Sequence, residues 1–331
     1  MRGLNDFLAE CNHGPRINEL AGFFAATAAG KSGMPLRRPL ADARLLPGDE
    51  LLRDLVALHA SRQGFFDQHY HGSIPYRLEE ECRMAYAVLK YARLRNTPLS
   101  LYSLGTAEGT MARTLAEFSA GQILSLSCSP NPENYKSFMA YGEPTHAEFF
   151  IGPFHWLTRD VLASDRRLAK FTQGFDLILE DTTFQMYSPN RPKQIEFVTQ
   201  NLKEGGIFVF VEKFRAVDED DYQRREEQKD YGFKARYFPH DEIERKKAAV
   251  LGTMFINEVT LEDMARAVGT HFTHCVMTWN SGNFCSLAAS NSRENLELYV
   301  SQMPGPAIPH EYVYEPGLSP GATSTVTEGP V

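Results

Sequence analysis

Residues 101–110, LYSLGTAEGT, decide how the rest of this chain is interpreted. An apolar strand pattern, LYSL, runs directly into a turn that contains Gly105 and Gly109, and the helical pattern MARTLAEF follows. Glycine adopts left-handed backbone conformations at little steric cost, so it suits a sharp reversal from strand to helix. The free N–H groups at the start of the helix make such a turn a natural ligand cradle.

The spacing of the glycines narrows the ligand that this turn can hold. A dinucleotide-binding turn carries GxGxxG, and a phosphate loop carries GK[ST] before its helix. Residues 105–110 read GTAEGT and contain neither pattern. The turn is therefore either a cradle for another kind of ligand or a tight strand–helix connection that binds nothing.

Strand and helix patterns alternate on both sides of this turn. The strand patterns PLSLYSL, GQILSLSCS, FDLILEDT and IFVFVEKF are separated by amphipathic segments. Such alternation predicts a parallel sheet with helices on both faces. The last two strand patterns, FTHCVMTWN and NFCSLAAS, flank a turn at Ser281 and Gly282, which predicts an antiparallel hairpin. We therefore predict an α/β fold with a doubly wound, mostly parallel seven-stranded sheet that ends in this hairpin.

Composition divides the chain into three parts, the second of which carries an insertion. Residues 1–65 have helical patterns and form a predicted N-terminal cap, and residues 66–291 carry the sheet. A charged helical insertion at about 216–252 is a candidate lid, because its aromatic residues adjoin a glycine and a proline. Prolines and glycines accumulate in residues 292–331, for which we expect a disordered tail.

Composition also excludes several classes of partner. The 331 residues carry a net charge of −8, which argues against direct binding of nucleic acid. No run approaches the roughly 18 apolar residues that span a bilayer, and the start of the chain lacks a signal-peptide pattern. The five cysteines include no CxxC pair, and His69 and His71 have no third ligand nearby, so we predict no metal site. These features indicate a cytoplasmic protein with a small-molecule substrate.

The order of these segments resembles that of the class I S-adenosylmethionine-dependent methyltransferases, which have a Rossmann-like fold. Within them the chain is most similar to the carboxy-S-adenosylmethionine synthases, over about residues 66–288. The matching motifs are FFDQHYHGSIPYRLEE, LYSLGTAEGTMA, ILSLSCSPN, DTTFQMYSP, LKEGGIFVFVEKF, DEIERKKAAVLGTM and TWNSGNFCSLAA. The glycine loop and LKEGG occur in many methyltransferases, whereas EKF and W-x-x-x-NF-x-SL are more selective.

The resemblance implies S-adenosyl-L-methionine, or a carboxylated derivative of it, as the cofactor. The positions that match the family's cofactor contacts are Tyr76, Ser103, Gly105, Thr106, Gly109, Ser127 and Asp181. The family has acids where this chain has Ser103 and Ser127, and an arginine where it has Lys247. A hydroxyl is a weaker acceptor than a carboxylate, and lysine lacks the two-pronged geometry of arginine. We expect the amides around Gly105 and Gly109 to face an open crevice large enough for a nucleoside sulfonium.

Polar residues near the strand ends are the candidates for catalysis and substrate binding. Asp181, Gln185 and Lys213 follow the fourth and fifth strands, at the edge where such sheets bind ligands. The alternative roles are a helix cap for Asp181 and an ion pair of Lys213 with Glu212. Candidates for the substrate pocket and the lid are Tyr187, Tyr237, Lys247, Trp279 and Asn283.

Three functions remain open on the sequence. The first is an S-adenosylmethionine-dependent methyltransferase that acts on a small molecule or a metabolite-like group. The second is a carboxy-S-adenosylmethionine synthase-like enzyme linked to tRNA modification. The third is a non-catalytic binding scaffold with a methyltransferase-like fold, which the serines at 103 and 127 favour. The N-terminal cap is in addition a candidate surface for a homodimer.

Overall fold

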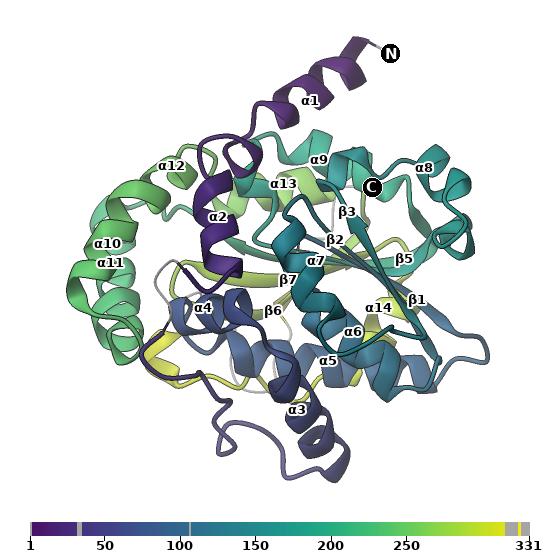
Figure 1. The fold of residues 1–331 in the computed structure, drawn as a ribbon, viewed down its shortest axis with the longest axis horizontal. Helices are drawn as coiled ribbons and strands as arrows, with labels where there is room; N and C mark the ends of the chain where they lie inside the picture. Colours follow the sequence, from purple (N-terminus) through teal and green to yellow (C-terminus); the bar gives the residue numbers. More distant parts are fainter. Residues whose placement is uncertain (1, 32–34, 106, 315–323, 326–331) are drawn as a thin grey trace.

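A mostly parallel sheet runs through the centre of the molecule (Figure 1). The computed structural model describes residues 2–31, 35–105, 107–314 and 324–325. The strand order is β3-β2-β1-β4-β5-β7-β6, and the two-residue β8 (Ser324–Thr325) pairs with β6. The seven longer strands are β1 (Leu99–Leu104), β2 (Ile123–Ser129), β3 (Ala147–Ile151), β4 (Phe175–Asp181), β5 (Leu202–Lys213), β6 (His274–Ser281) and β7 (Phe284–Ser290). The predicted fold class is confirmed, including the antiparallel hairpin of β6 and β7.

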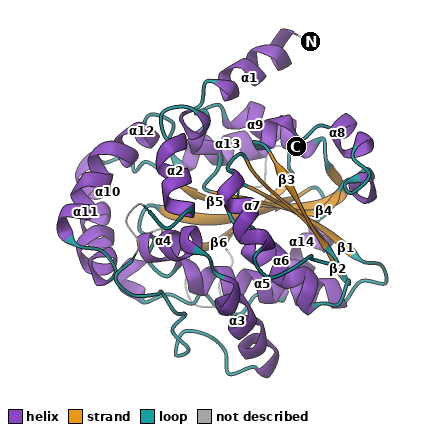
Figure 2. Cartoon of the chain, viewed as in Figure 1, coloured by secondary structure: helices purple, strands orange, loops and turns teal. Residues whose placement is uncertain are grey.

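Helices cover both faces of the sheet because successive side chains of each strand point to opposite sides (Figure 2). In β1, Leu99 and Leu101 join one hydrophobic cluster, whereas Tyr102 and Leu104 join the other. The first cluster includes side chains of α3 (Glu50–Arg62), α5 (Arg77–Arg93), α6 (Thr110–Phe118) and α14 (Arg293–Ser301). The second includes side chains of α8 (Arg159–Ser164), α9 (Arg191–Thr199) and α13 (Leu261–Gly269). None of the described helices is both long enough and apolar enough to cross a bilayer.

The strand order reverses between β1 and β4, and this places the candidate site. From β1 the chain proceeds outward through β2 to β3, and it then returns to the centre at β4. Both central strands are parallel, so their carboxyl ends, at Leu104 and Asp181, lie at the same edge of the sheet. Ligands of doubly wound sheets bind where the strand order reverses, at this edge.

The helices before the sheet pack into the same core. In α1 (Arg2–Asn12), Phe7 and Cys11 are buried, and the ring of Phe7 lies 5.6 Å from that of Phe197 in α9. Helix α2 (Ala21–Ala28) contacts α4 (Phe65–Ser73) and α7 (Pro132–Met139). The predicted N-terminal cap is therefore continuous with the sheet and has no separate core of its own.

The insertion after β5 is helical, as the sequence predicts. It comprises α10 (Glu219–Glu227), α11 (His240–Lys246) and α12 (Gly252–Phe255), with wider π-helical turns at Gln228–Phe233 and Lys247–Leu251. Figure 1 places these helices together at one end of the molecule, beside α2 and α4. We call this segment, residues 216–255, the lid.

The beginning of the predicted tail is folded, which corrects the expectation of disorder for residues 293–301. These residues form α14, in which Leu296 and Tyr299 are buried against the first cluster. Ser292 caps the helix by accepting a hydrogen bond from the backbone of Asn295. The apolar spacing of Leu296 and Tyr299, three residues apart, was obscured by the prolines that follow in the sequence.

Helix α14 should contribute to the stability of the whole domain. We expect Tyr299→Ala to lower the free energy of unfolding by about 3 kcal/mol or more, because it removes a buried ring that packs edge-on against Tyr91. Leu298→Ala, a change at an exposed neighbour in the same helix, should cost less than about 1 kcal/mol. Denaturant unfolding of both variants checks this, and equal losses would contradict it.

Candidate functional site

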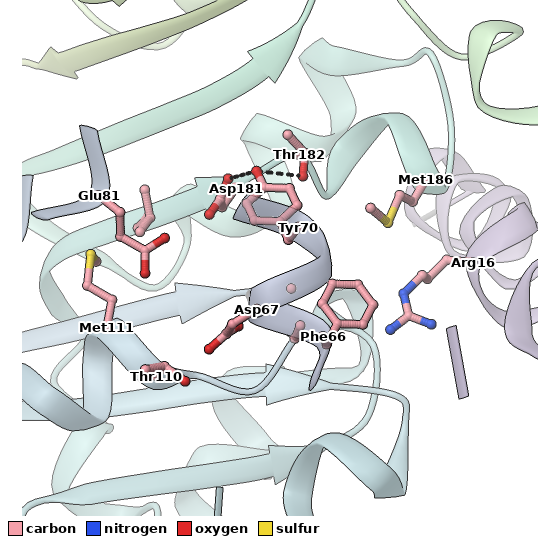
Figure 3. A pocket seen from close by; sticks show the side chains of 13 residues that line it. Arg16, Phe66, Asp67, Tyr70, Glu81, Thr110, Met111, Asp181, Thr182 and Met186 are labelled. Carbon is pink, nitrogen blue, oxygen red and sulfur yellow. Dashed lines mark hydrogen bonds between the residues drawn. The ribbon is translucent and has the colours of Figure 1, made fainter. Parts of the chain in front are cut away.

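A narrow crevice lies at the carboxyl ends of β1 and β4. Gly105 and Asp181 line it from the strands, whereas Phe66, Asp67 and Tyr70 line it from α4. Figure 3 shows these α4 side chains among the lining residues of the sheet edge. The cavity volume is only about 40 Å³, compared with the roughly 300 Å³ or more of typical small-molecule pockets. The expected open crevice is therefore wrong for this conformation, because α4 fills it.

The carboxylate of Asp181 ties α4 to the sheet. Its Oδ1 accepts a hydrogen bond of 2.5 Å from the hydroxyl of Tyr70, and its Oδ2 accepts one of 2.6 Å from the guanidinium of Arg77. Burial and the charge of Asp181 both raise the pKa of Tyr70, so this hydroxyl stays protonated and donates. Both oxygens of Asp181 are thus engaged, and the residue is a paired anion here.

The glycine turn binds α4 through Glu108. The buried carboxylate of Glu108 accepts hydrogen bonds from the backbone N–H groups of Phe66 at 3.4 Å and of Asp67 at 3.2 Å. A carboxylate at these first N–H groups caps the helix and complements its dipole. Gly64 makes this approach possible, since a Cβ atom there would lie 2.2 Å from the Glu108 carboxylate.

The two glycines of the turn are packed against neighbouring side chains. Both have left-handed φ angles of +68°. A Cβ atom on Gly105 would lie 1.8 Å from Oγ1 of Thr183, and one on Gly109 would lie 2.5 Å from Oγ of Ser127. Gly105 also lines the crevice, so the lack of a Cβ atom at this position permits both the left-handed turn and the close packing of the cavity wall.

Two further residues of the crevice have strained backbones. Ala107 and Thr182 have φ angles of +45° and +50°, in a region that branched side chains such as threonine rarely adopt. Strain of this kind costs about 1–3 kcal/mol and is concentrated at functional sites in proteins. Its presence at both walls of one crevice supports a functional role for this edge of the sheet.

Buried carboxylates that the sequence analysis missed surround the crevice. Burial, and then the charges of Glu108 and Glu81, raise the pKa of Asp67 well above its ordinary value. Burial also opposes ionisation of Glu81, but His71, His59 and Arg77 outweigh it and hold its pKa well below its ordinary value. Glu81 is therefore a stable anion, whereas Asp67 is held close to other negative charges.

A second cavity, of about 120 Å³, adjoins the crevice beneath the lid. Phe66, Tyr70, Thr182 and Met186 line both cavities. Its apolar lining includes Phe23 and Phe24 of α2, Phe66 of α4, and Val250 and Met254 of the lid. Its polar lining includes the predicted residues Gln185 and Lys213, together with His69, Lys229, Lys234, Lys246 and Glu258.

Other predicted site residues lie outside the lining of these two cavities. Ser103 is buried within β1, and Ser127 lies behind Gly109. Tyr76 packs on Phe233 and Tyr312. The remaining positions are as follows: Tyr187 lies in the core between Phe154 and His155, Tyr237 packs on Phe233, Trp279 packs with Ile74 and Phe284, and Asn283 donates to Glu226. Thr106 lies outside the residues that the structure describes.

Three lysines of the lid line the cavity, Lys229, Lys234 and Lys246, whereas the predicted Lys247 does not line it and is half-exposed. Lys246 is spaced three residues after Ile243 and four before Val250, so it shares their buried face. Lys247 is one residue further on, about 100° around the helix. The helical period of the sequence is enough to identify Lys246 as the inward-facing residue, whereas the matching of motifs alone selected Lys247.

Most of the cavity-lining residues that were not predicted lie in no sequence pattern that would indicate a site. Arg16 reaches the crevice from a 3₁₀ turn (Pro15–Ile17) more than 80 positions before the glycine turn, and its guanidinium lies 4.0 Å from the ring centre of Phe24. Asp67 and Tyr70 stand in a motif that the family resemblance had marked, but their contacts depend on how α4 lies across the strand ends.

Comparisons with known proteins return structures and no sequence relatives. No family model matches the chain, and no curated protein matches it. The plantazolicin methyltransferase BpumL, crystallised with a desmethyl plantazolicin analogue and SAH, is 13% identical at a TM-score of 0.46, over 73% of this chain and 98% of that one. Human N-acetylserotonin methyltransferase, in complex with SAM, is 14% identical at a TM-score of 0.41, over 84% of this chain and 69% of that one. The arsenic(III) S-adenosylmethionine methyltransferase of Chlamydomonas reinhardtii is 14% identical at a TM-score of 0.38, over 58% of this chain and 62% of that one.

The buried Asp67 should reduce stability at neutral pH. Because folding raises the pKa of Asp67, the folded state binds more protons than the unfolded state, and stability falls as the pH rises above about 4. We expect Asp67→Asn to raise the free energy of unfolding at neutral pH by on the order of 1 kcal/mol and to flatten its decrease above about pH 4. Urea unfolding at several pH values measures both effects. Asp54→Asn, at an exposed position of α3, is the control and should change neither; a less stable Asp67→Asn variant would contradict the prediction.

Proposed function

We infer that this chain is an S-adenosylmethionine-dependent methyltransferase whose cofactor crevice is closed by α4 in the described conformation. The observation that carries the proposal is the position of the crevice. It opens beside the glycine turn that follows β1, at the reversal of strand order, and Gly105 and Asp181 form its walls. The same edge contains the two strained residues Ala107 and Thr182.

One buried oxygen of the crevice fits a hydroxyl group of a nucleoside. Asp67 lines the crevice, and its Oδ2 atom is buried and has no hydrogen-bond partner among the described residues. An unpaired buried polar atom costs about 1–3 kcal/mol, so this atom would gain from an arriving hydroxyl. Asp67 would supply, from α4, the carboxylate that this chain lacks at Ser103 and Ser127.

Methyl transfer from S-adenosylmethionine requires little covalent chemistry from the protein itself. When bound, the cofactor supplies an activated methyl group on a positively charged sulfur. The chain's part is to align the acceptor with that methyl group and to exclude water. Thr182 stands at the boundary of the two cavities, and Gln185 presents to the second cavity an Oε1 atom that has no partner among the described residues. Gln185 is thus placed to accept a hydrogen bond from an acceptor's hydroxyl or amine.

Binding of the cofactor requires α4 to move, because about 40 Å³ cannot contain a nucleoside. The contacts that would be released are those of Glu108 with the first turn of α4 and that of Tyr70 with Asp181. We expect the amides of residues 65–73 to exchange hydrogen faster than those of β4 in the free protein. Exchange equally slow in both segments would contradict a mobile α4.

Calorimetric titration with S-adenosylhomocysteine tests the proposed function directly. We expect a dissociation constant between about 1 μM and 1 mM for the wild type, the usual range for enzyme ligands. Asp67→Asn should weaken binding about tenfold, because an amide group replaces one of the two oxygens that can accept a hydrogen bond from the ligand. Asp54→Asn, which is exposed, serves as the control and should bind as the wild type does. The absence of binding at millimolar ligand would overturn the proposal.

A non-catalytic scaffold is the second candidate, and the filled crevice favours it. Phe66 and Tyr70 occupy the space that a nucleoside would need, and Glu108 caps α4 over it. In a scaffold these contacts would be permanent, so α4 would be as protected from exchange as the core and S-adenosylhomocysteine would not bind. The two measurements above therefore distinguish the candidates.

We do not extend the proposal to a carboxylated cofactor. The residue that matched the family's arginine, Lys247, lies outside the lining of both cavities, and its neighbour Lys246 lines the cavity beside the crevice. Mass spectrometry of a ligand that co-purifies with the protein would identify a carboxylated sulfonium if one were bound.

A further inference from the structure

The cavity beneath the lid holds more positive than negative charge. Four lysines line it: Lys213, Lys229, Lys234 and Lys246. Three carboxylates lie within 3.4 Å of lysine ammonium groups there: Glu226, Glu258 and Asp230. Four ammonium groups face three carboxylates, so one positive charge is left over.

The surplus charge lies on the side of Lys234 and Lys246. Lys213 is satisfied, since Glu226 and Glu258 each lie 3.0 Å from it, and Lys229 lies 2.6 Å from Glu226. Lys234 has Asp230 at 3.4 Å, a carboxylate that it shares with Lys229.

Lys246 has no close carboxylate among the described residues. Its Nζ lies 2.5 Å from Nε2 of His69 and 4.1 Å from the ring centre of Phe238. The nearest carboxylate, that of Glu242, is 4.0 Å away and is bound to Arg245 at 2.6 Å. Neither a neutral imidazole nor a phenyl ring cancels a buried charge.

The pKa shifts of Lys246, Lys234 and His69 agree with this geometry. Burial, and then the charge of Lys234, lower the pKa of Lys246 to about 7. Burial, and then Lys229, lower the pKa of Lys234 to about 8. The pKa of His69 falls well below its ordinary value through burial, Lys246 and Lys234. Each group is thus destabilised as a cation, and an anion placed among them would relieve all three.

Apolar side chains also line the cavity, beside polar ones such as Gln185. They include Phe23 and Phe24 of α2, Phe66 of α4, and Val250 and Met254 of the lid. This wall adjoins the crevice through Phe66, so a molecule with its apolar part here and its anionic end at Lys246 would reach the strand ends.

We propose that this cavity is the acceptor site, and that it binds a small, largely apolar molecule through a terminal oxyanion held by Lys234 and Lys246 beside His69. The assignment of the ligand as a methyl acceptor rests on the proposed function. The anion site itself does not, because it is defined by the lysines and the apolar wall alone. The shared chemistry is an oxyanion on an apolar body, whether carboxylate, sulfonate or phosphate ester.

Calorimetric titration with benzenesulfonate, in the full chain and without cofactor, tests this inference. We expect benzenesulfonate to bind and the neutral benzenesulfonamide to bind at least about tenfold more weakly. Lys246→Met should weaken binding of benzenesulfonate about tenfold or more, and Lys247→Met, the adjacent change on the same helix, less than about twofold. Benzoate and phenyl phosphate, titrated in parallel, show which oxyanion the site prefers.

The charge on Lys246 predicts the pH dependence of this binding. Benzenesulfonate keeps its charge, so its affinity should fall from about pH 6 to about pH 9 as Lys246 loses its proton. The titratable and charged groups that face Lys246 are His69, Lys234, Glu242 and Arg245. Lys246→Met should flatten this profile, whereas a variant that keeps the full slope would contradict the role of Lys246.

Chemical labelling provides a measurement that does not depend on a variant. Benzenesulfonate should protect Lys246 of the wild type from acetylation, as read by peptide mass spectrometry, and leave the exposed Lys136 unchanged. Equal affinity for sulfonate and sulfonamide, equal loss in the two lysine variants, or labelling that sulfonate does not affect would overturn the inference. Binding of S-adenosylhomocysteine is measured separately, so failure of the proposed function is distinguishable from failure of the anion site.

Discussion

The carboxylate of Asp181 is the constraint on which the arrangement of the site depends. It sits at the end of a central strand and binds Tyr70 of α4 and Arg77 of α5 at the same time. Arg77 is fully buried and also lies 3.4 Å from Glu81. Removing one member of a buried ion pair commonly costs about 3–5 kcal/mol, so the pair of Arg77 with Asp181 holds α5 firmly against the sheet edge, whereas α4 is held by the neutral hydroxyl of Tyr70. The hydrogen bond of Tyr70 with Asp181, together with those of Phe66 and Asp67 with Glu108, holds α4 across the crevice in the described conformation.

In the described conformation, the glycine turn contacts other residues of the protein at the positions where it would contact a ligand in an open site. Glu108 binds the start of α4, Thr183 packs on Gly105, and Ser127 packs on Gly109. A ligand that bound at this turn would have to displace some of these contacts and fit beside the others. The Oδ2 atom of Asp67, which lines the crevice, has no partner among the described residues, so the replacement of polar partners is incomplete there.

The two cavities differ in how far their charges are paired. In the crevice, Asp181 is bound to Arg77, Glu81 is bound to His59, His71 and Arg77, and Arg16 also lines the wall. In the neighbouring cavity beneath the lid, Lys246 has no carboxylate closer than 4.0 Å among the described residues. An added anion would therefore be stabilised more in the second cavity than in the crevice.

Local pattern was enough to establish the sheet, its helices and its terminal hairpin, because the apolar period of each segment depends only on nearby residues. It also marked the candidate edge of the sheet, through Gly105 and Asp181. Lys247 was selected over Lys246 by matching motifs, although the helical spacing from Ile243 to Val250 already indicates that Lys246 faces inward. The sequence did not show that α4 closes the edge, since the contacts of Tyr70 with Asp181 and of Asp67 with Glu108 join residues more than 40 positions apart. Long-range packing decides where α4 lies, and no single segment of the sequence contains those contacts.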